Sequence, residues 1–488
     1  MSVNRILNES PLDSAPTPAG PLVQIKPLDK SQWVPSRFNA RTTAKDGRVI
    51  IWNTYTGSVS VFEPKYKEAL DGMLRNRGGF SGALDGLGKY LYQRGFIVPK
   101  ETNEYRRFQL LFGQQHYSAD ALELILLASE DCNFRCVYCY EDFARGTMLP
   151  HVREGVKNLV RKRVADGLRH FRISWFGGEP LYGFKAVEDL APFFAETARE
   201  HSINYGSHMT TNGYLLTPEV AERLFAWQIT DYQITIDGTA EQHDHKRMTR
   251  EGGETFQVIF SNLRAIKKIK EPFSITIRVN YDKENYPHLE DLMVRLEKEF
   301  SGDERYKVAF RAVGQWGGPN DANLSVCGVD ETRQIVSQLK RSAIAKGLNM
   351  DTVRQSSRPG SQVCYAARPF NFIIGAEGKV MKCTIALDKE DYNVVGMLSS
   401  DGELHLDPDK FARWVEPAFA GDTVCQSCYL VPTCQGMHCP LVRFETNKQP
   451  CPSTKSSLRD ELLTALEVGE SRARPAAAST AGTQPAPL

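Results

Sequence analysis

The sequence predicts an α/β protein built around a partial (β/α)6 barrel, with a small α+β module before it and a cysteine-rich domain after it. From residue 121 onward, strand-like apolar runs alternate with helical patterns, and such alternation predicts a parallel sheet with right-handed crossovers. The predicted strands cover residues 122–128, 171–176, 207–211, 232–236, 274–280 and 308–313. Because six strands are fewer than the eight of a closed TIM barrel, we expect an open, TIM-like barrel with its chemistry at the carboxyl ends of the strands.

Two further segments flank the predicted barrel. Before it, Asp46-Gly47 and Thr56-Gly57 precede short β-branched runs, which is a hairpin signal, and helical patterns follow at 66–75 and 83–93. After about residue 355 the alternation stops, and cysteine, glycine and proline set the pattern up to Cys451. The predicted domains are a disordered tail at 1–30, a small α+β module at 31–115, the barrel at 116–350, the cysteine-rich domain at 351–452, and a helix with a disordered tail at 453–488.

The composition excludes several classes of protein. The 488 residues include 60 Lys and Arg against 59 Asp and Glu, a net charge of +1, so the chain as a whole has no field to steer it onto nucleic acid or anionic lipid. No apolar run approaches the roughly 20 residues of a membrane span, and the N-terminus lacks a secretory signal. We therefore expect a cytoplasmic protein that binds neither nucleic acid nor membrane. In that compartment its 11 cysteines predict metal or catalytic sites rather than disulfides.

The first cysteine group follows the first predicted barrel strand directly. Cys132, Cys136 and Cys139 have the spacing CxxxCxxC, which can fold three thiolates around one iron–sulfur cubane and supplies no fourth ligand. One iron would then stay open to an outside chelate, and an open iron predicts chemistry rather than a structural role. The alternative is a zinc site, but such a site normally shows CxxC pairs or a nearby histidine, and His151 is poorly spaced for it.

This loop, with the aromatic Tyr138 before its third cysteine, resembles that of the radical S-adenosylmethionine superfamily. In that family the open iron chelates S-adenosylmethionine, whose reductive cleavage yields a 5′-deoxyadenosyl radical. The resemblance implies that the GGEP segment after the second strand binds the methionyl amino group, and that Thr235 and Arg247 hold the ribose or the carboxylate. Asn280, at the end of the fifth strand, is a weaker mark. The residues implied to bind the cofactor are Tyr138, Gly177, Gly178, Glu179, Pro180, Thr235, Arg247 and Asn280.

Seven further cysteines lie between positions 364 and 451. Their pattern closely resembles the SPASM domain, an extension that binds two auxiliary 4Fe–4S clusters, except that four residues rather than three separate Cys434 from Cys439. The resemblance assigns an outer cluster to Cys425, Cys428, Cys434 and Cys451, and an inner cluster to Cys364, Cys383 and Cys439. Cys327 is the remaining cysteine and would complete the inner cluster; an inner cluster that stays open to substrate fits as well.

The resemblance implies three 4Fe–4S clusters and S-adenosylmethionine as cofactors, and an oxidation of a peptide side chain as the reaction. One outcome in this branch is a thioether or carbon–carbon crosslink in a ribosomally made precursor peptide. The other is the conversion of a sulfatase Cys or Ser to formylglycine. Sulfatase maturases carry an Asp directly after the second cysteine of the CxnGx4C element as the base, and Thr384 stands there, which favours crosslinking; no general base is predicted.

The partners expected from this resemblance are a precursor peptide with its leader and an electron donor such as flavodoxin or ferredoxin. Residues 31–115 resemble a small winged-helix element that grips the leader, and such an element can add the leader as a strand to an exposed sheet edge. A hairpin that merely packs on the barrel is the structural alternative. From a different class of protein, a zinc-stabilised interaction scaffold without turnover fits the cysteines of residues 425–439 taken alone.

Overall fold

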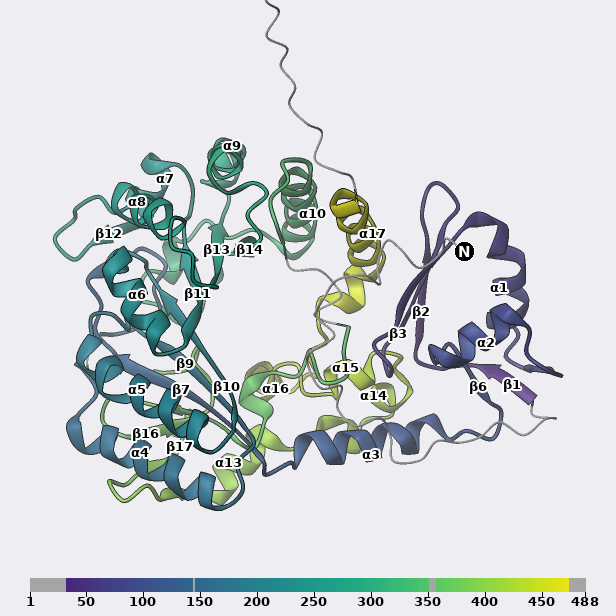
Figure 1. Ribbon diagram of the computed structural model, residues 1–488, viewed down its shortest axis with the longest axis horizontal. Coiled ribbons are helices and arrows are strands. Elements are labelled where there is room, and N and C mark those ends of the chain that lie inside the picture. The colour runs from purple at the N-terminus through teal and green to yellow at the C-terminus, as the bar shows by residue number, and fades with distance from the viewer. Residues whose placement is uncertain (1–31, 144, 351–356, 474–488) are drawn as a thin grey trace, which may run out of the picture. The chain divides into compact units, whose positions relative to one another are not determined.

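The computed structural model describes residues 32–143, 145–350 and 357–473, with side chains up to residue 470 (Figure 1). The described residues form two compact units: residues 32–102, Ser357 and 457–473 in the first, and 103–350 with 358–456 in the second. The predicted tails at 1–30 and beyond residue 473 lie outside the described residues. Among the described residues, no helix is both long and apolar enough to cross a membrane.

The first unit combines two small antiparallel sheets with short helices. One sheet has the order β5-β1-β6 and the other β2-β3-β4. The elements are β1 (Gln32–Pro35), β2 (Asn39–Thr43), β3 (Val49–Asn53), β4 (Val59–Phe62), α1 (Lys67–Leu74), β5 (Phe80–Ser81), α2 (Gly86–Gln93), β6 (Ile97–Pro99) and the C-terminal α17 (Thr454–Ala473). The core packs Trp33, Ile51, Phe62, Leu70 and Phe96 together. The helical patterns predicted at 66–75 and 83–93 correspond to α1 and α2.

The second unit contains a ten-stranded sheet whose larger part is parallel. All six predicted barrel strands are present, and they lie side by side in chain order. They are β7 (Ala121–Ser129), β9 (His170–Gly177), β10 (Asn204–Thr211), β11 (Ile229–Thr235), β13 (Ser274–Tyr281) and β14 (Tyr306–Ala312). An α/β fold around a large central sheet is therefore confirmed.

The cysteine-rich segment extends this same sheet, a feature that the sequence did not predict. Strand β15 (Asn371–Ile374) pairs in parallel with β7, and β16 (Lys379–Met381), β17 (Val394–Leu398) and β18 (Leu404–Leu406) continue from it as antiparallel strands. As a result β7 is covered on both faces. Leu124 and Leu126 join the main core, whereas Ile125 and Leu127 pack with Ile373 from the added strands.

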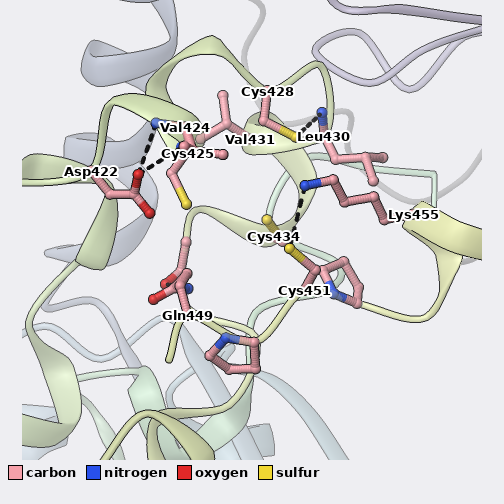
Figure 2. Close-up of a pocket in the computed structure, with 13 residues that line it drawn as sticks. Asp422, Val424, Cys425, Cys428, Leu430, Val431, Cys434, Gln449, Cys451 and Lys455 are labelled. Carbon is pink, nitrogen blue, oxygen red and sulfur yellow. Dashed lines mark hydrogen bonds between the residues drawn. The ribbon is translucent and has the colours of Figure 1, made fainter. Parts of the chain in front are cut away.

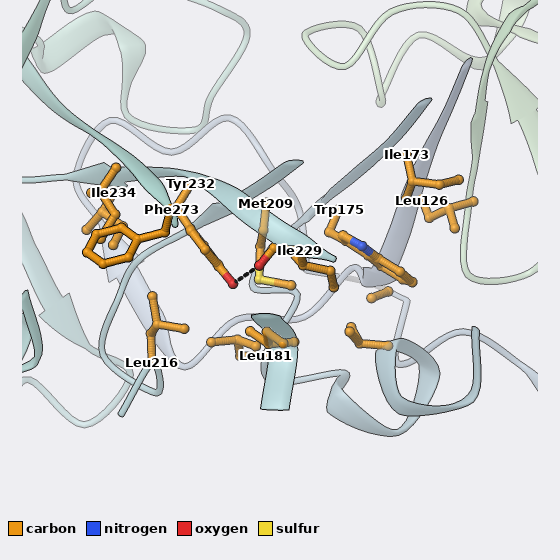
Figure 3. Close-up of a cluster of buried hydrophobic side chains, with 14 of the residues drawn as sticks. Leu126, Ile173, Trp175, Leu181, Met209, Leu216, Ile229, Tyr232, Ile234 and Phe273 are labelled. Atoms are coloured by element: carbon orange, nitrogen blue, oxygen red, sulfur yellow. Dashed lines mark hydrogen bonds between the residues drawn. The ribbon is translucent and has the colours of Figure 1, made fainter. Parts of the chain in front are cut away.

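Helices cover the outer face of the parallel strands (Figure 1). They are α4 (Pro150–Ala165), α5 (Phe184–Glu200), α6 (Pro218–Ala226), α7 (Ala240–Lys246), α8 (Phe256–Ile266), α9 (Leu289–Phe300) and α10 (Val329–Ala345). The core beneath them includes Leu126, Ile173, Trp175 and Met209 (Figure 3), all nearly or fully buried. Since every second residue of a strand faces the helices, the intervening residues face the opposite side, and the candidate site is built there.

Candidate functional site

The loop that carries the first three cysteines begins where β7 ends. Cys136 closes the short strand β8 (Phe134–Cys136), which pairs antiparallel with β12 (Arg247–Thr249) so that Cys136 lies opposite Arg247. Cys132 is buried, and Cys136 and Cys139 are near enough to act on it electrostatically. Burial raises the pKa of the Cys139 thiol to about 12 and raises that of Cys132 as well. Thiols with such raised pKa values stay protonated until a metal displaces their protons.

The two glycines after β9 allow the GGEP loop to approach the cysteine loop. The Gly178 N–H donates to the Ser129 carbonyl at 3.0 Å, and the Glu179 N–H donates to the Asp131 carbonyl at 3.1 Å. A Cβ at Gly177 would lie 2.2 Å from the Ser129 oxygen, and one at Gly178 would lie 2.5 Å from the Asp131 oxygen. Both glycines therefore serve backbone-to-backbone packing against the start of the cysteine loop.

The Glu179 side chain ties this loop to the next strand. Its carboxylate is fully buried and accepts hydrogen bonds from the Leu181 N–H at 2.9 Å, the Thr211 hydroxyl at 2.7 Å and the Asn212 N–H at 2.7 Å. Asn212 in turn donates through Nδ2 to Asn133 in the cysteine loop at 2.8 Å. The carboxyl ends of β7, β9 and β10 are thus joined by one hydrogen-bond network.

Tyr138 is the centre of a second network at the carboxyl ends of β11 and β13. Its hydroxyl donates to Asp237 and accepts from Arg247 at 2.7 Å and from Asn280 Nδ2 at 3.1 Å. Asp237 also accepts from the Asn280 N–H at 3.0 Å. Thr235, the last residue of β11, is buried. The structure thus brings Arg247 and Asn280 together on the Tyr138 hydroxyl, and it adds Asp237 to this network as a further acceptor.

Arg247 has an unused donor inside this network. Its Nε is buried and has no hydrogen-bond partner among the described residues. Burial lowers the pKa of this guanidinium, but Cys136, Tyr138 and Asp237 outweigh that effect and raise the pKa well above its usual range. A buried donor without a partner costs free energy. An anionic cluster, or the carboxylate of a cofactor, would satisfy the Arg247 Nε donor and balance its positive charge.

The cysteines of the C-terminal region form two further groups. Cys364 and Cys439 act electrostatically on Cys383, and burial raises the pKa of Cys364 to about 11 and of Cys383 to about 12. Thr384 lies beside this group, where its hydroxyl is 2.7 Å from the Tyr365 hydroxyl and its N–H donates to that oxygen at 2.9 Å. These three cysteines are the ones that the resemblance assigned to an inner cluster, an assignment that stays a prediction.

The other four cysteines surround one cavity. Cys425, Cys428, Cys434 and Cys451 line a space of about 80 Å³, several times what a single water requires, and their sulfur atoms lie around it (Figure 2). They are carried by α14 (Thr423–Ser427), α15 (Val431–Cys434) and the loops beside them. The Lys455 ammonium donates to Cys451 Sγ at 3.4 Å. These four cysteines are the ones that the resemblance assigned to an outer cluster, an assignment that stays a prediction.

Cys327 is not among the main groups that act electrostatically on the cysteines of the three sets. It precedes α10, and the groups that act on it are Glu331, Asp282 and Lys283. His438 is also engaged elsewhere, with Nδ1 at 3.3 Å from the Gln362 carbonyl. Thiolates are the ordinary ligands of iron–sulfur clusters. The sets of three, three and four cysteines therefore have the type of side chain that such clusters need. As the side chains stand, no three or more His, Cys, Asp or Glu of the described ranges are arranged to hold a metal ion.

The chain is similar in sequence to several known proteins. Residues 126–296 match the Radical SAM superfamily. A cysteine-type anaerobic sulfatase-maturating enzyme of Clostridium novyi is 26% identical over 182 residues, 36% of this chain and 48% of that enzyme. Mycofactocin maturase MftC of Mycobacterium tuberculosis is 25% identical over 333 residues, 64% of this chain and 77% of that protein. Several other curated relatives are matched over about half of their length.

A solved structure shares the fold. The structure of anSMEcpe with bound AdoMet and the Cp18Cys peptide superposes with a TM-score of 0.54 at 18% identity, and the match covers 72% of this chain and 99% of that one. At this level of identity the likeness concerns the fold.

Proposed function

Because the chain belongs to the radical S-adenosylmethionine superfamily, we propose that it is an enzyme that oxidatively modifies a ribosomally made precursor peptide, for example by a thioether or carbon–carbon crosslink. The observation that carries this proposal is the grouping of ten cysteines into sets of three, three and four, with the first set at the carboxyl end of β7. A set of three leaves one iron of a cubane open to a substrate or cofactor.

Cys132, Cys136 and Cys139 would hold the first 4Fe–4S cluster, and the Tyr138 network would hold S-adenosylmethionine beside it. Bound there, the cluster and S-adenosylmethionine supply a 5′-deoxyadenosyl radical able to remove a hydrogen atom from a side chain. The chain's own part is placement: Arg247 offers its free Nε to an anionic group, and Glu179 fixes the glycine loop against the cysteine loop.

The two C-terminal sets would hold auxiliary clusters, the inner one on Cys364, Cys383 and Cys439 and the outer one on the four cysteines around the cavity. No cysteine of the inner set is among the groups that act electrostatically on Cys327, which favours an inner cluster with one open iron. These clusters would provide ligation of the substrate or an exit for electrons, whereas a donor such as flavodoxin or ferredoxin would supply the electron that cleaves S-adenosylmethionine.

Maturation of a sulfatase is the second candidate, because a sulfatase-maturating enzyme is among the relatives. Against it stands Thr384, which carries no carboxylate and whose hydroxyl lies against Tyr365. A threonine hydroxyl cannot serve as the base near neutral pH. Formation of formylglycine in a sulfatase-derived peptide by the purified enzyme would reverse this ranking.

The first unit would recognise the leader of the precursor peptide. Its small antiparallel sheets have edge strands that an extended peptide could join.

Deletion of residues 1–102 should weaken binding of the precursor by about tenfold or more, equivalent to about 1.4 kcal/mol. The deoxyadenosine formation that the enzyme shows in the absence of peptide should remain. The deletion spares α3 (Glu104–His116), whose Phe108 and Phe112 pack on Phe419 of the second unit. Unchanged peptide affinity would reject the leader role.

The experiment that tests the function is an anaerobic reconstitution with iron and sulfide, followed by assays of iron, sulfide, zinc and deoxyadenosine per chain. We expect about twelve irons for three filled cubanes and deoxyadenosine release under a strong reductant. Zinc in place of iron, without cleavage of S-adenosylmethionine, would instead support an interaction scaffold.

A further inference from the structure

Two arginines lie on the inner face of the sheet, where the candidate site is built. On β13, Ile277 and Val279 are fully buried beneath the helices, so Arg278 and Asn280 face the other side of the strand. Asn280 is the register partner of Arg311 on the adjacent parallel strand β14. Arg278 and Arg311 therefore share the inner face on neighbouring strands.

Arg278 reaches the candidate site directly. Its Nε donates to Asn280 Oδ1 at 2.8 Å, and Asn280 Nδ2 donates to the Tyr138 hydroxyl at 3.1 Å. Tyr138, Asp237 and Tyr140 all act electrostatically on this guanidinium. The positive charge of Arg278 thus lies beside the residues that would hold S-adenosylmethionine.

The charges of these two arginines are not balanced within the described part of the chain. Burial, together with the neighbouring Arg311, lowers the pKa of Arg278. Neither guanidinium forms an ion pair with a carboxylate of the described residues, and Asp237 is already engaged by Tyr138 and the Asn280 N–H. Two like charges held side by side are unfavourable, and Asp237, the carboxylate that acts on Arg278, is shared with Tyr138 and Asn280. Their arrangement is therefore suited to an anion that the chain does not itself supply.

We infer that Arg278 and Arg311 bind a carboxylate of the substrate, which is either the C-terminal carboxylate of the peptide or the side chain of an Asp or Glu near the modified residue. This inference rests on the proposed function and names a recognition element of the substrate. A carboxylate is the only anionic group of an unmodified peptide near neutral pH, and the planar guanidinium fork matches its geometry.

The probes are short synthetic peptides offered to the full-length, reconstituted enzyme with S-adenosylmethionine. One pool is Ac-Gly-Gly-Xaa with a free C-terminus, the second is the same pool with an amidated C-terminus, and the third contains Ac-Gly-Asp-Gly-amide and Ac-Gly-Glu-Gly-amide. Binding is measured by saturation-transfer NMR and calorimetry. We expect carboxylate-bearing peptides to bind about tenfold or more tightly than amidated ones without a carboxylate, since hydrogen bonds to charged groups are worth about ten- to hundredfold in affinity.

Substitutions of the two arginines test whether they cause this preference for carboxylate-bearing peptides. Arg311 is exposed, and its guanidinium forms no hydrogen bond or ion pair with the described residues. R311Q should therefore fold and lose the preference, while R311K should keep part of it because the charge remains without the planar fork. R278Q should weaken the binding of the same carboxylate-bearing peptides. The matched control is R264Q, on the outer helix α8, where Arg264 pairs with Glu299 at 3.1 Å; it should keep the preference.

The outcomes separate the two proposals. A preference for the first pool identifies a C-terminal carboxylate, and a preference for the third identifies an acidic side chain. If wild-type enzyme forms deoxyadenosine but binds all pools equally, the inference is wrong while the proposed function stands. If R311Q weakens the binding of S-adenosylmethionine at least as much as the binding of the peptides, the arginines bind the cofactor and the inference is also wrong. Absence of iron and of deoxyadenosine in the wild type would overturn the proposed function itself.

Discussion

Replacing Cys132, Cys136 and Cys139 together by alanine should abolish deoxyadenosine formation and leave about eight of about twelve irons in the reconstituted protein. The reason is the separation of the cysteines into three groups. In each group the thiols act electrostatically on one another: Cys136 and Cys139 on Cys132, Cys364 and Cys439 on Cys383, and Cys434 and Cys451 on Cys425. Loss of the first site should therefore remove one cluster and the only site that the proposal gives to S-adenosylmethionine.

Iron analysis and product formation should be read on the same sample, with the electron paramagnetic resonance of the reduced protein to count the remaining clusters. Cys327→Ala is the matched control, because no cysteine of the three sets is among the groups that act electrostatically on Cys327, and its removal should keep all the iron. If the triple variant still cleaves S-adenosylmethionine, the assignment of the first cluster to these three cysteines is wrong. Loss of about four irons in Cys327→Ala would restore Cys327 as the fourth ligand of the inner cluster.

Gly178→Ala should damage the same site without touching a thiol. The new Cβ would lie 2.5 Å from the Asp131 oxygen and 2.7 Å from the Asp131 carbonyl carbon. These are backbone atoms at the start of the cysteine loop, so the loop itself must move. We expect the free energy of unfolding to fall by about 1–3 kcal/mol, as for other overpacked sites, together with loss of about four irons and of deoxyadenosine formation.

Thermal unfolding followed by circular dichroism measures the first effect, and iron analysis measures the second. The control is Gly113→Ala in the helix α3, where a Cβ would meet nothing within 4 Å; it should be neutral or stabilising by about 0.5–1 kcal/mol. If Gly178→Ala has the stability and iron content of Gly113→Ala, then the two loops are not held together by the contact described above.

Local patterns were enough to predict most of the second unit. The six parallel strands are where apolar runs indicated, and the residues Leu289, Leu292, Met293 and Leu296 form the buried face of α9. Both signals come from the period with which side chains face one side of a strand or a helix, and this period is a property of the local backbone. Because the strand ends could be predicted from this period, the cysteine loop and the GGEP segment could also be placed after the first and second strands.

The contacts that complete the site could not be predicted in this way. Asp237 joins Tyr138 to Asn280 across 99 and 43 residues of chain, and Glu179 joins β9 to the end of β10 across more than 30 residues. Arg278 and Arg311 had no motif of their own, and only the alternation within β13 and β14 could have shown that they face away from the helices. Strands β15 to β18 were missed because each is short and lies among turns.

The sequence by itself determined the class of fold and the family resemblance, because spacing and periodicity are local and survive without knowledge of the fold. Only the tertiary structure decided that the cysteine-rich region continues the parallel sheet, and that two guanidiniums without an ion pair among the described residues lie on the same face of that sheet. The physical reason is that pairing between distant strands and the balance of buried charges depend on which residues the folded chain brings together, and a linear pattern does not contain that information.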